Sequence, residues 1–92
     1  MPSIRVTVPG LLQHTLGGRT STTIDAATLP ELIATLKQRH PLLVPLIWDE
    51  TGTLRKHVLI FLNDTATRWL EWEDVALHDG DTVAIVQAVS GG

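Results

Sequence analysis

Apolar and polar residues alternate over the first positions of the chain, where the apolar members are Ile4, Val6 and Val8. A period of two is typical of a strand that buries one face, so we predict a strand at residues 3–8. The β-branched run at residues 19–24 predicts a second strand, antiparallel to the first. The intervening loop contains three leucines that we expect to pack locally: Leu11, Leu12 and Leu16.

The spacing of apolar residues then changes to that of a helix. One stripe with the spacing i, i+3, i+4 and i+7 is formed by Leu29, Leu32, Ile33 and Leu36. Thr28 followed by Glu31 is a capping-box pair, which predicts where the helix begins. Pro41 predicts its end at residue 40, because the residue before a proline is disfavoured in the α region. We therefore predict one amphipathic helix.

The second half of the chain predicts more strands than helices. Residues 42–48 are interpreted as a short turn, and residues 56–62 are the strongest strand signal of the chain. A short strand is predicted at 65–68. Residues 79–81, with the sequence Asp-Gly-Asp, predict a tight turn before a last strand at 82–88.

The order of these elements indicates an α+β fold. The simplest packing lays the helix across one face of a mixed four- to five-stranded sheet, with the first and last strands adjacent and parallel in the middle. We expect one domain at residues 1–89, followed by a flexible tail at 90–92.

Composition excludes several classes of function. The chain has 92 residues, a net charge of −3 and no cysteine, so cysteine nucleophiles and thiolate zinc sites are absent. Its seven lysines and arginines are scattered along the sequence, which argues against a nucleic-acid-binding protein. No apolar run approaches the length of a membrane span, and we expect a cytoplasmic protein. The histidines lack metal-ligand spacing, so no metal site is predicted: His14, His40, His57 and His78.

The last three residues, Ser90, Gly91 and Gly92, are the main candidate for chemistry. A carboxylate that enters another enzyme's narrow nucleotide site, to attack the α-phosphorus of ATP, is best carried on residues without a Cβ atom. Gly92 would be the reacting residue and Gly91 its slender stem. The alternative is a frayed or vector-derived terminus.

Several motifs in order resemble those of the ubiquitin-like β-grasp sulfur carriers, the family of the molybdopterin synthase small subunit and the thiamin sulfur carrier. They are an N-terminal hairpin, the Thr-x-x-Glu cap, Val-x-Ile-x-x-Asn-Asp at the end of a strand, Asp-Gly-Asp, and the final Gly-Gly. Within that family the chain is most similar to the carrier for cysteine biosynthesis. The His-Thr-x-Gly-Gly loop at 14–18 and the Ala-Val-Ser-Gly-Gly ending at 88–92 carry this similarity.

The resemblance implies a protein substrate rather than an enzyme. An adenylyltransferase of the ubiquitin-activating type would adenylate the Gly92 carboxylate, and a sulfur nucleophile would convert it to a thiocarboxylate. A pyridoxal-phosphate cysteine synthase would accept the sulfur, and a metalloprotease would release the product. ATP and pyridoxal phosphate would bind to these partners, and no cofactor would bind to this chain.

Three alternatives stay open. The chain would be a molybdopterin synthase small subunit if its partner were the large subunit of that enzyme, or a ubiquitin-like modifier if Gly92 were conjugated to other proteins. The third is an interaction module whose tail is incidental.

Strand alternation also predicts where partners dock. The helix should cover one face of the sheet, so that an apolar set projects from the other: Leu59, Phe61, Ala84, Val86 and Ala88. We call this set the helix-free face. Exposed apolar patches often mark protein interfaces. The alternatives are that central strands are simply apolar on both sides, or that the loop of residues 9–19 folds over them.

Overall fold

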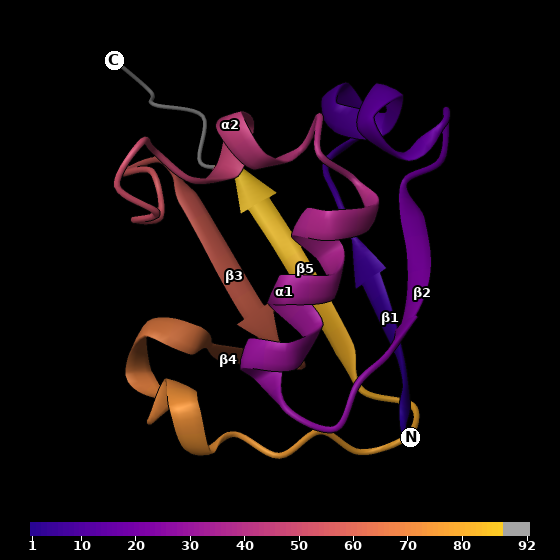
Figure 1. The fold of residues 1–92 in the computed structure, drawn as a ribbon, viewed down its shortest axis with the longest axis vertical. Coiled ribbons are helices and arrows are strands. Elements are labelled where there is room, and N and C mark those ends of the chain that lie inside the picture. Colours follow the sequence, from indigo (N-terminus) through magenta and orange to yellow (C-terminus); the bar gives the residue numbers. More distant parts are fainter. Residues whose placement is uncertain (88–92) are drawn as a thin grey trace.

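The computed structural model describes residues 1–87, in which one sheet of five strands has the order β2-β1-β5-β3-β4 (Figure 1). The strands are β1 (Ser3–Thr7), β2 (Ser21–Asp25), β3 (Val58–Leu62), β4 (Thr65–Ala66) and β5 (Thr82–Gln87). The first and last strands are neighbours at the centre and run parallel, with Thr7 opposite Ala84. The pairs β1–β2, β3–β5 and β3–β4 are antiparallel. The predicted mixed sheet with a central parallel pair is therefore confirmed.

One helix, α1 (Leu29–Arg39), lies across one face of this sheet (Figure 1). Its start is the predicted one, since the Thr28 hydroxyl accepts a hydrogen bond from the Glu31 N–H at 3.4 Å. The four residues of the predicted apolar stripe are all buried. At the other end, the His40 N–H donates to the Leu36 carbonyl at 2.9 Å and Pro41 stops further winding.

The core lies between α1 and the sheet. Ile4, Val6 and Val83 come from the central strands, and each is fully buried. The predicted short turn is the one-turn helix α2 (Val44–Ile47), next to which Leu43 and Trp48 are also buried.

The segment between β1 and β2 differs from the prediction. It forms a 3-10 helix at Gly10–Leu16, followed by Gly17 and Gly18 with φ angles of 67° and 90°. Because these two glycines turn the chain, β2 begins at Ser21 rather than at residue 19. Leu12 and Leu16 join the main core instead of packing locally, whereas the third leucine of this segment, Leu11, is 71% exposed.

Other strand boundaries also differ from the prediction or lie beyond what the structure describes. The third strand begins at Val58 rather than residue 56, because the Val58 N–H donates to the Arg55 carbonyl in a preceding turn. The fourth strand has two residues rather than four, since the chain enters a 3-10 helix at Thr67–Trp69. The fifth strand is described up to Gln87, and the end predicted for it at residue 88 lies outside the described residues.

The expected tail at 90–92 and the domain boundary at 89 also lie outside the described residues. Within residues 1–87, no helix is long and apolar enough to cross a membrane.

Candidate functional site

The register of the two central antiparallel strands defines the helix-free face. Leu59 lies opposite Val86, and Phe61 lies opposite Ala84. Directly opposed residues project from the same side of a sheet, so these four side chains form one patch. Val86 is 40% exposed and the other three are half-buried. The structure therefore brings together four of the five predicted docking residues, and their role in docking stays a prediction.

The remaining predicted site residues are Ala88, Ser90, Gly91 and Gly92, which lie outside the described residues. The structure does describe where the chain leaves the sheet towards them. Gln87 pairs with Val58 at the beginning of β3, and α2 lies at the same end of the sheet (Figure 1). The chain thus leaves the sheet beside the basic segment at residues 55–57, whose sequence is Arg-Lys-His.

This end of the sheet is held by hydrogen bonds between loops. The Arg55 Nε–H donates to the Pro45 carbonyl at 2.7 Å, which joins the segment before β3 to α2. Asp49 organises the neighbouring turn by accepting from the Thr51 hydroxyl at 2.7 Å and from the Thr53 N–H at 3.0 Å. These hydrogen bonds hold the pKa of Asp49 below its ordinary value, the Thr51 hydroxyl being the main cause.

The predicted turn at residues 79–81 is confirmed at the opposite end of the sheet. The Asp79 carboxylate accepts from the Ser3 N–H at 2.7 Å, which joins the turn to the start of β1. Asp81 accepts from the His78 N–H at 2.8 Å and from the Asn63 side-chain amide at 3.1 Å. Mainly because of the hydrogen bond from the His78 N–H, the pKa of Asp81 lies below its ordinary value. The turn therefore connects the end of β3 to the beginning of β5.

Asp81 should make stability depend on acid pH. Its pKa is lowered by folding, so its contribution is present above the unfolded pKa and is lost as pH falls through the folded pKa. We expect Asp81→Asn to be less stable than the natural protein at pH 7, with a difference that shrinks towards about pH 2. Urea unfolding at a series of pH values measures this difference.

The matched control for that measurement is Asp64→Asn. Asp64 is exposed, and within residues 1–87 its carboxylate accepts no hydrogen bond. A stability difference for Asp81→Asn that is equal at pH 7 and pH 2 would show that its charge does not stabilise the turn.

Two features were missed in the sequence. Lys37 lies outside the apolar stripe predicted for α1, and its Nζ lies 4.5 Å from the centre of the Trp48 ring. This cation–π contact ties the last turns of α1 to the segment after α2. In the sequence, the only sign of this contact is that Lys37, near the end of the predicted helix, is followed by Trp48 after a turn that contains proline. This sign is weak. The second feature is a cluster of basic residues around the edge of β3, formed by Lys37, Arg55, Lys56 and Arg68.

Comparison with known proteins gives consistent matches. A model of the ThiS family matches residues 6–92 of this chain. Sulfur carrier protein CysO of Mycobacterium bovis is 30% identical over 92 residues, which cover 98% of this chain and 99% of that protein. A chain in the crystal structure of the Amycolatopsis orientalis BexX/CysO complex is 29% identical with a TM-score of 0.81, covering 97% of this chain and 99% of that one. The crystal structure of SAMP1 from Haloferax volcanii matches with 25% identity and a TM-score of 0.77, over 98% of this chain and 99% of that one.

Proposed function

This chain belongs to the ThiS family and has the ubiquitin-like β-grasp fold, and from that premise we propose that it is a sulfur carrier whose Gly92 carboxylate becomes a thiocarboxylate. The observation that carries the proposal is the similarity to sulfur carrier protein CysO over nearly the full length of both chains. The match to the family model runs to residue 92 of this chain, so it includes Ser90, Gly91 and Gly92.

The chemistry proposed for Gly92 takes place in two steps. A carboxylate oxygen attacks the α-phosphorus of ATP in a partner of the ubiquitin-activating type, and pyrophosphate leaves. A sulfur nucleophile supplied by a partner then attacks the carbonyl carbon of this mixed anhydride, and AMP leaves. The product carries sulfur in place of one carboxylate oxygen. Catalytic groups and ATP belong to the partner, so this chain acts as a protein substrate.

Cysteine biosynthesis is the destination that we propose for the sulfur. The name CysO of the relative favours it, and so does the resemblance of the Ala-Val-Ser-Gly-Gly ending at residues 88–92 to that of the carriers for cysteine biosynthesis. The acceptor would be an aminoacrylate on a pyridoxal-phosphate synthase in the cytoplasm, followed by release of the product by a metalloprotease. A molybdopterin synthase large subunit is the acceptor in the alternative proposal.

A ubiquitin-like modifier is the second candidate, because the fold is shared with SAMP1 of Haloferax volcanii. Carrier and modifier use the same activated Gly92 and differ in the nucleophile that displaces AMP. Lys37 and Lys56 are the only lysines of the chain, so self-conjugation has few acceptor sites.

Intact mass spectrometry tests the proposal. We expect the chain, incubated with its adenylyltransferase, ATP and a sulfur donor, to gain about 16 Da because sulfur replaces one oxygen. Formation of the acyl-adenylate without this gain, while a control carrier is thiocarboxylated, would contradict the sulfur-carrier proposal. A covalent adduct with another protein would instead favour the modifier.

We further propose that the activating partner docks on the helix-free face. Val86 is the most exposed of its described members, and a carboxylate there would be buried without a partner in a docked complex. We expect Val86→Asp to weaken binding to the adenylyltransferase by about tenfold or more, a loss of about 1.4 kcal/mol. Isothermal titration calorimetry measures the affinity.

The matched control is Gln38→Asp, an exposed position on α1, which covers the opposite face of the sheet. Circular dichroism verifies that both variants are folded. Unchanged affinity for Val86→Asp would place the docking surface elsewhere.

A further inference from the structure

The outer edge of β3 is only partly paired. β5 pairs with all five residues of β3, whereas β4 pairs only with Phe61 and Leu62. The chain turns into the 3-10 helix Thr67–Trp69 after β4 and does not extend the pairing. In the part of the chain that the structure describes, residues 58–60 therefore have no strand beside them on that flank (Figure 1). Such an edge is a template for an added strand.

Hydrogen bonds indicate which backbone groups face this edge. The Asn63 N–H donates to the Thr82 carbonyl at 2.8 Å, on the β5 side. Backbone groups alternate along a strand, so those of Leu59 face β5 while those of Val58 and Ile60 face outward. The Val58 N–H is already used by the Arg55 carbonyl at 3.0 Å. An incoming parallel strand would place one residue opposite Leu59. The backbone N–H of that residue would donate to the Val58 carbonyl, and its backbone carbonyl would accept from the Ile60 N–H.

A groove follows the same edge. Its volume is about 250 Å³, and its apolar walls include Leu54, Leu59 and Ala66. A second groove of about 510 Å³ adjoins it and extends towards α1, since both are lined by Ile60 and Arg68. An extended segment on the β3 edge would thus have apolar surface available for its side chains.

The charged side chains that line these two grooves are all basic, although the whole chain is acidic. Arg55, Lys56 and Arg68 line the first groove, Lys37 lines the second, and neither groove has a carboxylate in its lining. These are four of the seven lysines and arginines of a chain with a net charge of −3. Within residues 1–87, none of the four forms a salt bridge.

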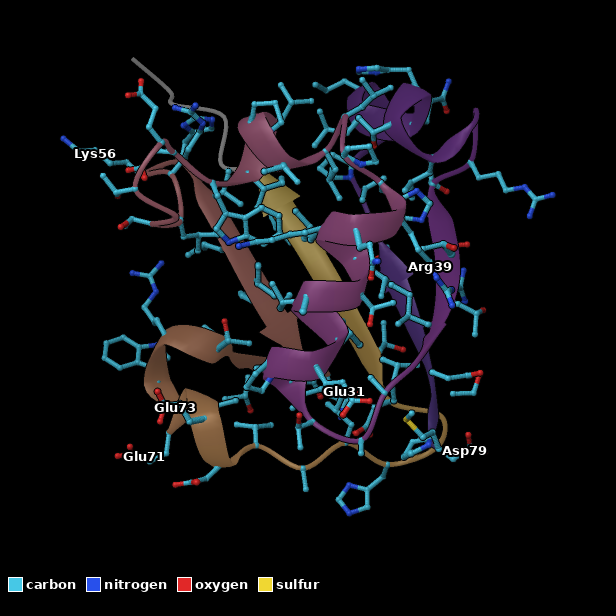
Figure 2. All side chains as sticks on the ribbon, viewed as in Figure 1. Glu31, Arg39, Lys56, Glu71, Glu73 and Asp79 are labelled. Atoms are coloured by element: carbon cyan, nitrogen blue, oxygen red, sulfur yellow. The ribbon has the colours of Figure 1, made fainter. Side chains whose placement is uncertain are left out.

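Figure 2 is consistent with this separation of basic and acidic side chains. Figure 2 shows Lys56 projecting outward from the segment before β3, whereas Glu71 and Glu73 lie near the opposite end of this flank. These glutamates do not line either groove. We define the basic edge groove as the free β3 edge at residues 58–60 together with Lys37, Arg55, Lys56 and Arg68.

We propose that the basic edge groove binds an extended acidic segment of a partner protein as an added β-strand. Main-chain hydrogen bonds to Val58 and Ile60 would supply the pairing, and the cations would select aspartate or glutamate side chains. This groove adjoins the helix-free face, with which it shares Leu59, and the proposal does not depend on chemistry at Gly92.

The same observations disfavour other occupants. A second copy of the chain would bring like-charged edges together, which is repulsive. A nucleic acid would require stacking surfaces inside the grooves, but the aromatic residue in their lining, Trp48, is only 6% exposed, and the exposed Trp69 is not part of the lining.

Peptide titration followed by NMR tests the proposal. The probe is a ten-residue blocked peptide in which glutamate alternates with valine, added to the full chain at low ionic strength. We expect the largest amide shifts at residues 58–60.

A second peptide has the same sequence with alternate backbone nitrogens methylated, which removes strand pairing and leaves the charges. We expect it to bind at least about tenfold more weakly, because two main-chain hydrogen bonds are lost. Equal affinity of the two peptides would overturn strand addition.

Charge reversal tests the selection of acidic segments. We expect Arg68→Glu and Lys56→Glu each to weaken binding of the unmethylated peptide about tenfold, and a version with lysine in place of glutamate not to bind. The matched control is Arg19→Glu, because Arg19 is exposed and lines neither groove. Equal weakening by the control would overturn the assigned site.

Two results would overturn the assigned occupant. One is tighter binding of a single-stranded oligonucleotide than of the peptide. The other is dimerisation of the free chain through residues 58–60.

Discussion

Deleting Gly92 is expected to abolish thiocarboxylate formation, with a loss of more than about 100-fold in the rate of adenylation. The deletion keeps a terminal carboxylate, now on Gly91, but shortens the reach of the chain by about 3.5 Å. Misplacement of a reacting group by about 1 Å can already cost about 100-fold. Pyrophosphate release measures adenylation, and intact mass measures transfer of sulfur.

The matched control for this deletion is Ser90→Ala, which preserves both glycines and the length of the tail. We expect it to be adenylated within a few-fold of the natural rate. The deletion lies beyond β5, so the midpoint of urea unfolding should not change. Normal adenylation of the shortened chain would disprove the role of Gly92.

Truncating the helix stripe is expected to have the largest effect on stability. Leu32 is fully buried between α1 and the sheet. Leu32→Ala removes apolar contacts and leaves a cavity, which typically costs about 2–5 kcal/mol of unfolding free energy. For a small domain with a total stability of about 5–15 kcal/mol, this is a large fraction. Urea unfolding followed by circular dichroism measures the change.

Gln38→Ala is the matched control because Gln38 is exposed on the same helix. Its effect should stay within about 0.5 kcal/mol. A loss below about 1 kcal/mol for Leu32→Ala would mean that α1 contributes little to the core.

Predictions succeeded where a periodic pattern coincided with a buried face. The alternation around Val6 and the stripe that includes Leu36 predicted which side chains enter the core, because burial on one side imposes a period on the sequence. The same alternation predicted that Phe61 and Ala84 share a face, which the register confirms.

Predictions were wrong where local hydrogen bonds end an element. Apolar residues at the start of β3 do not reveal that the Val58 N–H turns back to Arg55, so this strand was predicted too long. Likewise, Leu12 and Leu16 carry no strand or helix period, and their 3-10 helix was not predicted.

The basic edge groove was missed for a different reason. Lys37, Lys56 and Arg68 are far apart in the sequence and appeared scattered. Only the folding of α1, the segment before β3 and the 3-10 helix after β4 around one edge brings them together. Clusters that form across distant segments leave no pattern in a single sequence.

The central position of β5 bears on the order of events during synthesis. A ribosome releases the hairpin of β1 and β2 first, and that of β3 and β4 later, but neither hairpin pairs with the other. Both pair with β5, which follows all four of these strands in the sequence. A nascent chain that stops before Thr82 would therefore hold two half-sheets without a shared middle, exposed to proteolysis. The strand that leads to Gly92 is thus also the one that completes the sheet, so the end that we propose to be reactive is synthesised only after the whole sheet can form.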